Sequence, residues 1–243
     1  MFDISNKKIL ITGGSSGIGK ALSEGFCMAD ALVTCLDIKK PEDSIKIDYI
    51  KCDLSKLGSI DLALKQYMKK NKCPDVIINC AGATLPGESN KYKQKDWDQT
   101  LSINLTAVFH ICKKIGDKMI RSKIQGSIIN FTSIGAEQGF PNNPAYAATK
   151  GAIKQLTKAL AVEWGQYGIR VNNIAPGYTI TPMNIKSWNN KKLRKMRSDQ
   201  TILKRWAKPE EMVGPTIFLA SDASSYVTGT DLIVDGGWLA KGI

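Results

Sequence analysis

The chain has 243 residues, of which 43% are hydrophobic and 23% charged, and its formal net charge at pH 7 is +12. This balance excludes a disordered or collagen-like chain, and the length suffices for one large α/β domain whose core needs no disulfide or metal. No apolar run reaches the roughly 20 residues of a membrane span, and the N-terminus lacks a signal-peptide pattern. We therefore expect a cytoplasmic protein with no membrane partner.

Cysteine and histidine usage narrows the chemistry. The six cysteines are scattered without a C-x-x-C pair, which favours reduced thiols over a zinc site or a redox dithiol. His110, the one histidine, lies in an apolar helical stretch, and we expect a structural role for it. These features predict no metal centre and no histidine-based triad.

Short β-branched runs alternate with longer helical patterns along the whole chain. Strands are predicted at 8–12, 32–36, 76–79, 127–131, 170–174 and 232–234, with one more before Cys52. Helices are predicted near 18–28, 59–70, 97–121, 146–165 and 209–220. Nearly continuous apolar strands separated by helices predict a parallel sheet covered on both faces. With no linker or repeat to divide the chain, we predict a single α/β domain over 1–243, doubly wound around a seven-stranded parallel sheet.

The first predicted strand leads into a glycine-rich turn, and a helical pattern follows it. Its residues expected to contact a cofactor are Gly13, Ser15, Ser16, Gly17, Ile18 and Gly19. Glycines permit a tight turn close to a pyrophosphate, which then meets the amides of the helix N-terminus. Asp37 ends the second strand, where a carboxylate can bind both ribose hydroxyls of NAD and would repel the 2′-phosphate of NADP. We predict a Rossmann fold that binds NAD in preference to NADP.

Further motifs follow in order along the chain. They are Asn79-Cys80-Ala81-Gly82, Ser133 at the end of a strand, Tyr146-x-x-x-Lys150 on the next helix, Pro176-Gly177 and Asp235-Gly236-Gly237. With the Gly-x-x-x-Gly-x-Gly spacing of the turn, this series resembles the short-chain dehydrogenase/reductase family over residues 7–238. The resemblance implies hydride transfer between a nicotinamide and a secondary alcohol or ketone. It also implies a catalytic tetrad of Asn104, Ser133, Tyr146 and Lys150.

The Tyr146 and Lys150 spacing also has a physical reason, because residues four apart share one helix face and can approach a common ligand. An ordinary tyrosine has a pKa of about 10, too high for efficient proton transfer at neutral pH. We expect the Lys150 ammonium and an oxidised nicotinamide to lower it, which makes Tyr146 the general acid and base. Ser133 would donate a hydrogen bond to the substrate oxygen. By resemblance, Lys150 also holds the nicotinamide ribose, and Asn104 positions a water behind it.

Simpler interpretations stay open for single residues. Taken alone, Ser133 is a strand-end serine and Asn104 caps a helix kink. Asp53, followed by Leu54, matches the family's adenine-contacting acid, but a cap for the next helix explains it as well. Thr179 takes the place of an aliphatic residue whose backbone contacts the nicotinamide amide. Besides the glycine turn, Asp37, Tyr146 and Lys150, the implied cofactor contacts are Asp53, Leu54, Asn79, Ala81, Gly82, Pro176, Gly177, Thr179 and Thr181.

The segment 183–208 carries nine Lys or Arg residues against Asp199 alone. In the resembled family this segment folds over the substrate as a lid. A solvated basic helix explains most of the charges, whereas a carboxylate or phosphate on the substrate would engage one or two of them. Guanidinium binds carboxylate in a bidentate manner, so the candidates are Arg194, Arg197 and Arg205. Trp188 and Trp206 flank the segment and are candidate pocket residues.

The C-terminal stretch is most similar to sugar-acid dehydrogenases of the gluconate 5-dehydrogenase and 2-deoxy-gluconate 3-dehydrogenase type. We therefore expect an NAD-dependent enzyme, homotetrameric by resemblance, acting on a polar or anionic sugar-like small molecule. A 3-oxoacyl-[acyl-carrier-protein] reductase is the alternative, because the basic segment suits an acidic carrier protein; those enzymes mostly use NADPH and lack an acid at the position of Asp37. A non-catalytic nucleotide-dependent regulator or nucleic-acid binder, raised by the net charge, would not need Tyr146 and Lys150 together.

Overall fold

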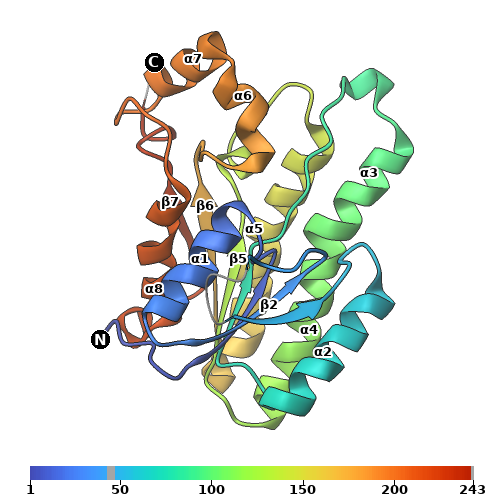
Figure 1. The fold of residues 1–243 in the computed structure, drawn as a ribbon, viewed down its shortest axis with the longest axis vertical. Coiled ribbons are helices and arrows are strands. Elements are labelled where there is room, and N and C mark those ends of the chain that lie inside the picture. The colour runs from blue at the N-terminus through green and yellow to red at the C-terminus, as the bar shows by residue number, and fades with distance from the viewer. Residues whose placement is uncertain (43–46, 242–243) are drawn as a thin grey trace.

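The computed structural model describes residues 1–42 and 47–241. Seven parallel strands form one sheet in the order β3-β2-β1-β4-β5-β6-β7 (Figure 1). They are β1 (Lys8–Thr12), β2 (Leu32–Asp37), β3 (Asp48–Lys51), β4 (Val76–Asn79), β5 (Ser127–Phe131), β6 (Arg170–Pro176) and β7 (Asp231–Val234). The predicted doubly wound sheet is confirmed, and its direction of winding reverses between β1 and β4, where such folds bind their ligands.

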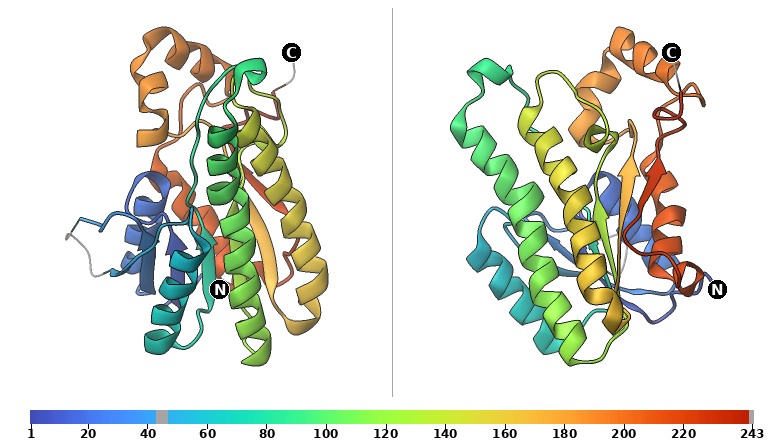
Figure 2. Two further views of the ribbon diagram at one scale, coloured as in Figure 1. Left: turned by 90° about the vertical axis from the view of Figure 1, so that its right-hand side faces the viewer. Right: turned by 180° about the vertical axis from the view of Figure 1, so that it is seen from behind.

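Helices cover both faces of this sheet (Figure 2). They are α1 (Gly17–Met28), α2 (Leu57–Asn71), α3 (Gln94–Leu101), α4 (Ala107–Arg121), α5 (Pro144–Trp164), α6 (Ile185–Asn189), α7 (Lys191–Gln200) and α8 (Val213–Ala220). One core joins α1 and α8 to the sheet, and a second joins α2, α4 and α5 to the opposite face. Because both faces are covered, every residue of β4 and β5 is buried. None of the described helices is long and apolar enough to cross a membrane.

The helix predicted over 97–121 is divided in the structure. A π-helical segment, Ser102–Thr106, separates α3 from α4 and contains Asn104. Such widened turns occur often at functional sites. A hydrophobic pattern with helical spacing does not reveal this change, because one widened turn is too short to alter the pattern visibly.

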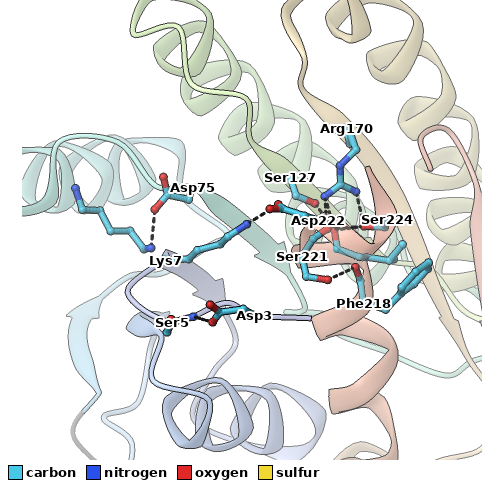
Figure 3. Close-up of polar contacts among 12 residues, drawn as sticks. Asp3, Ser5, Lys7, Asp75, Ser127, Arg170, Phe218, Ser221, Asp222 and Ser224 are labelled. Atoms are coloured by element: carbon cyan, nitrogen blue, oxygen red, sulfur yellow. Dashed lines mark hydrogen bonds and ion pairs between the residues drawn. The ribbon is translucent and has the colours of Figure 1, made fainter. Parts of the chain in front are cut away.

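A separate set of polar contacts lies at the amino ends of the strands (Figure 3). Arg170, which begins β6, donates to the carbonyl oxygens of Leu219 at 2.9 Å and Ser221 at 3.2 Å, and to Ser224 Oγ at 2.8 Å. These bonds satisfy carbonyls at the end of α8, which have no partner within the helix. They hold α8 to the sheet at the edge opposite the glycine turn. The helices α6 and α7 stand beyond the other edge, where the strands end (Figure 1).

Candidate active site

The backbone of the glycine turn between β1 and α1 is packed too closely for side chains. Gly13 and Gly17 have φ values of +73° and +53°, and a Cβ on Gly19 would lie 2.0 Å from the Gly13 carbonyl oxygen. Ser16 is the N-cap of α1, yet its side chain makes no capping hydrogen bond. The first amides of α1 therefore lack a side-chain acceptor and suit an anion. A dinucleotide's pyrophosphate fits this donor set.

The neighbouring strand ends supply the acids that the sequence predicted. Asp37 accepts hydrogen bonds from the backbone N–H groups of Ser15 and Lys39, both at 3.1 Å. This places its carboxylate beside the glycine turn, where a ribose would lie. Asp53 Oδ1 accepts from the Ser55 N–H at 3.0 Å and from its hydroxyl at 2.6 Å, which lowers the pKa of Asp53. The local turn before α2 thus accounts for Asp53, and the adenine contact stays a prediction.

The residues after β4 connect the glycine turn to the predicted tetrad. A Cβ on Gly13 would lie 2.8 Å from Ala81 Cα, so the two backbones are in contact. A Cβ on Gly82 would lie 3.6 Å from Asn104 Oδ1 and 3.8 Å from Lys150 Nζ. The predicted cofactor and catalytic residues therefore meet at one edge of the sheet.

Asn79 and Leu54, also predicted to contact the cofactor, have structural contacts of their own, and their cofactor contacts stay predictions. Asn79 is 2% exposed and donates to Asn130 Oδ1 at 2.8 Å within the sheet. Leu54 packs against the core on the α2 side.

Lys150 lies deep in the site. The residue is 5% exposed. Its ammonium donates to the Phe131 carbonyl at 2.6 Å and lies 5.5 Å from the centre of the Tyr146 ring. Burial lowers the pKa of Lys150 to about 8. An ammonium with this pKa can exchange a proton near neutral pH, as a relay behind Tyr146 requires.

Tyr146 differs from its prediction. Burial raises its pKa, and the neighbouring Ser133 hydroxyl, the second cause, lowers it by less. We expected Lys150 to lower this pKa, but in the chain itself the loss of hydration dominates, and the Lys150 ammonium is directed at the Phe131 carbonyl. The phenol is thus held protonated, the form that donates a proton to a carbonyl oxygen.

Ser133 and Asn104 show their simpler roles as well as their proximity to the site. Ser133 Oγ accepts the Gly135 N–H at 3.0 Å and so caps a short 3₁₀ turn, which leaves its own hydrogen free to donate. Asn104 is 1% exposed; its side chain accepts from the Ala83 N–H at 2.8 Å and donates to the Ala83 carbonyl at 2.9 Å. Asn104 therefore ties the π-helical segment to the loop after β4, and its role in placing a water stays a prediction.

The segment that follows β6 leaves the sheet and returns to its starting point. A Cβ on Gly17 would lie 3.3 Å from Thr181, which places Thr181 against the glycine turn. Thr179 is buried and pairs with Ala207 in an isolated parallel bridge, and the Ala207 N–H donates to the Tyr178 carbonyl at 2.9 Å. Pro176 ends β6, and Gly177 lies against Asp235 after β7. The two ends of the basic segment 183–208 therefore lie close together, beside the site.

Helix α7 separates its arginines from its lysines. Arg194 and Arg197 are half-buried and three residues apart, whereas the lysines at 191, 192 and 195 are exposed. The Arg194 guanidinium lies 4.9 Å from the centre of the Trp188 ring. Arg197 lies 4.4 Å from the Tyr178 ring and 5.8 Å from the Trp206 ring. The inner face of α7 thus presents guanidinium groups stacked on aromatic rings.

Tyr178 links this cationic face to the predicted catalytic tyrosine. Its ring centre lies 5.0 Å from that of Trp206 and 5.1 Å from that of Trp238, and its phenol is close enough to contribute to the raised pKa of Tyr146. The sequence reasoning missed Tyr178, although its place directly after Pro176-Gly177 could have identified it.

Arg205 is corrected by the structure. Its guanidinium binds Glu211 in a bidentate manner, at 2.7 Å and 2.6 Å, and lowers the pKa of Glu211 to about 2. Its two outer nitrogens already hold a carboxylate of the chain, so it is not free to bind one on a substrate. Trp206, the next residue in the chain, is buried, with 3% of its surface exposed. Of the three candidate arginines, Arg194 and Arg197 remain.

The family is decided by a comparison with known proteins. Residues 13–239 match a short-chain dehydrogenase family model described as enoyl-(acyl carrier protein) reductase. The chain is a short-chain dehydrogenase/reductase. It is therefore an oxidoreductase that depends on a nicotinamide dinucleotide, in agreement with the glycine turn and the Tyr146–Lys150 pair.

This dehydrogenase is similar to its relatives over its whole length. Gluconate 5-dehydrogenase from Gluconobacter oxydans (strain 621H) is 32% identical over 248 residues, covering 98% of this chain and 96% of the relative. A 3-oxoacyl-[acyl-carrier-protein] reductase from Thermotoga maritima is 36% identical over 244 residues, covering 96% and 98%. Among solved structures, a gluconate 5-dehydrogenase from Burkholderia cenocepacia J2315 in complex with NADP and tartrate has a TM-score of 0.94 at 30% identity, covering 99% of this chain and 98% of that chain.

Proposed function

We propose that this dehydrogenase transfers hydride between NAD(H) and a secondary alcohol or ketone on a sugar-like molecule that carries a carboxylate. The observation that carries the proposal is Arg197, stacked on Tyr178 beside Tyr146. The described residues give Arg197 aromatic partners but no ion pair, whereas Arg205 is already paired. A guanidinium oriented on aromatic rings is well placed to bind a carboxylate.

The chain's own groups divide the reaction between them. A bound nicotinamide supplies the hydride acceptor. In the oxidation, the carbinol hydrogen leaves as hydride, and Tyr146 takes the hydroxyl proton once it is a phenolate. Ser133 donates a hydrogen bond to the substrate oxygen as that oxygen gains negative charge. Lys150, with its pKa of about 8, can take that proton in its neutral form and pass it on towards solvent.

The preference for NAD over NADP rests on Asp37. Its carboxylate lies beside the glycine turn, where it would accept both ribose hydroxyls and repel a 2′-phosphate. The Burkholderia relative was solved with NADP, so the preference needs its own test. We expect Asp37→Ser to raise kcat/KM for NADP relative to NAD. A wild type that already prefers NADP would refute the assignment.

The substrate test compares molecules that differ only in the carboxylate. NADH formation is followed with aldonates and with the alditols of the same configuration, and Arg197→Ala should lower kcat/KM for aldonates only. Lys192→Ala is the matched control, because it removes a charge from the exposed face of the same helix. Equal losses on both substrate types would contradict the carboxylate role, and turnover confined to 3-hydroxyacyl thioesters would favour the carrier-protein alternative.

We also propose a homotetramer in the cytoplasm. Large apolar side chains are exposed on α4, α5 and the edge strand β7, namely Phe109 at 45%, Val162 at 83% and Ile233 at 46%. Apolar surface on two helices and on an edge strand supports association. The buried thiols of Cys35, Cys52, Cys73 and Cys112 suit a reducing compartment. Sedimentation at several protein concentrations tests the assembly, and a monomer throughout would contradict it.

A further inference from the structure

Helix α5 carries a third charged or titratable group in line with Tyr146 and Lys150. Lys154 follows Lys150 by four residues and therefore continues the same face of the helix. Its ammonium contacts Glu137 Oε1 directly and lies 3.9 Å from Asp231 Oδ2. The three side chains are 27%, 28% and 13% exposed. This ion cluster is more buried than an ordinary surface pair, which contributes little to stability.

Glu137 belongs to the turn that begins with Ser133. The Ser133 hydroxyl accepts the Gly135 N–H at 3.0 Å, and the Glu137 N–H donates to the Ile134 carbonyl at 3.1 Å. The turn is therefore short and closed by its own hydrogen bonds. The contact between Lys154 and Glu137 fastens this turn to α5, so it bears on the separation of Ser133 and Tyr146.

Asp231 extends the cluster into the sheet through a chain of side chains that all donate in one direction. Asn79 donates to Asn130 at 2.8 Å, and Asn130 donates to Thr157 at 2.9 Å. Thr157 donates to Asn173, and Asn173 to Asp231, both at 2.7 Å. The carboxylate sets this direction because it can only accept. The ion cluster thus also orients Asn79, which precedes the loop against the glycine turn.

We propose that Lys154, with Glu137 and Asp231, is a positioning residue that holds Ser133 at its working distance from Tyr146. Lys154 acts through these two residues. The inference rests on the proposed catalytic roles of Ser133 and Tyr146. Because small misplacements of reacting groups slow a reaction strongly, loss of the cluster should lower kcat more than it alters cofactor binding.

The experiment uses Lys154→Gln and Glu137→Gln, singly and together, with Lys154→Arg as the conservative variant. We expect each single change to lower kcat about tenfold or more, the double change to cost no more than the larger single one, and Lys154→Arg to retain most of the activity. KM for NAD should stay near the wild-type value. The primary deuterium isotope effect on kcat should rise, because hydride transfer becomes slower. Lys70→Gln, which breaks an exposed ion pair with Asp48, is the control.

The outcomes separate this inference from the proposed function. Unchanged kcat and isotope effect in Lys154→Gln and Glu137→Gln would overturn it, even with lowered thermal stability. So would additive losses in the double variant, because they would mean that the two residues act independently. If one single variant fails to fold, the other still tests the same contact. A wild type inactive on every alcohol would overturn the proposed function and this inference with it.

Discussion

Replacing Lys150 with methionine should affect the folding stability of this dehydrogenase and its turnover in different ways. Burial lowers the pKa of Lys150 from the ordinary 10.5 to about 8, which means that the folded chain holds the charged form at a cost of about 3 kcal/mol at pH 7. Methionine leaves the Phe131 carbonyl without the hydrogen bond that Lys150 donates to it, which costs about 1–3 kcal/mol. We therefore expect Lys150→Met to leave the free energy of unfolding at pH 7 unchanged or up to about 2 kcal/mol higher, with turnover lost.

The pH dependence gives a sharper test, because the sign follows from linkage. The folded pKa lies below the unfolded one, so between about pH 8 and 10.5 the unfolded chain holds a proton that the folded chain has released. The wild type should therefore gain stability relative to Lys150→Met as the pH rises through this window, by about 2 kcal/mol between pH 7 and about pH 9.5.

Urea unfolding of both chains at one protein concentration measures this difference, since any assembly makes stability depend on concentration. Lys158→Met is the control, because Lys158 is exposed on the same helix and should give no such slope. A difference between wild type and Lys150→Met that stays flat with pH would refute the buried-ammonium argument. So would a loss of several kcal/mol in Lys150→Met at pH 7.

Two further predictions concern the glycine turn and the core. Gly19→Ala should abolish NADH binding in a fluorescence titration, because its Cβ would lie 2.0 Å from the Gly13 oxygen. Gly58→Ala, whose Cβ meets nothing within 4 Å, is the control and should bind NADH normally. Retained binding in Gly19→Ala would contradict the role of the glycine turn in binding the cofactor. Tyr67→Phe should raise the free energy of unfolding by about 1 kcal/mol, since the Tyr67 hydroxyl is buried without a hydrogen-bond partner in the described part of the chain. A destabilised Tyr67→Phe would show that this hydroxyl does have a partner.

The sequence predicted the sheet well because its strands are buried on both faces. Strands β1, β4 and β5 occupy the predicted residues. Their short, continuous apolar runs are typical of strands that a parallel sheet buries on both faces. The division of the helix over 97–121 was not predictable in the same way. Within the divided segment Asn104 bonds to Ala83, and helical spacing does not reveal a contact between residues so far apart in the chain.

The candidate site was predicted in part, for similar reasons. The motif order brought Lys150, Gly82 and Asn104 together as expected, because the carboxyl ends of parallel strands share one edge. The choice among the arginines depended on partners that no spacing specifies: Glu211 for Arg205, and aromatic rings for Arg197. The raised pKa of Tyr146 could not be predicted either, since it follows from burial in the assembled fold.

The most direct test of the central claim is NADH formation from NAD and a panel of aldonates by the wild type and by Tyr146→Phe. We expect turnover of at least one aldonate by the wild type and its loss in Tyr146→Phe, with NADH still bound by that variant. Undiminished turnover in Tyr146→Phe would contradict the assignment of Tyr146 as the acid and base. A wild type that binds NADH yet oxidises no aldonate would contradict the proposed substrate class.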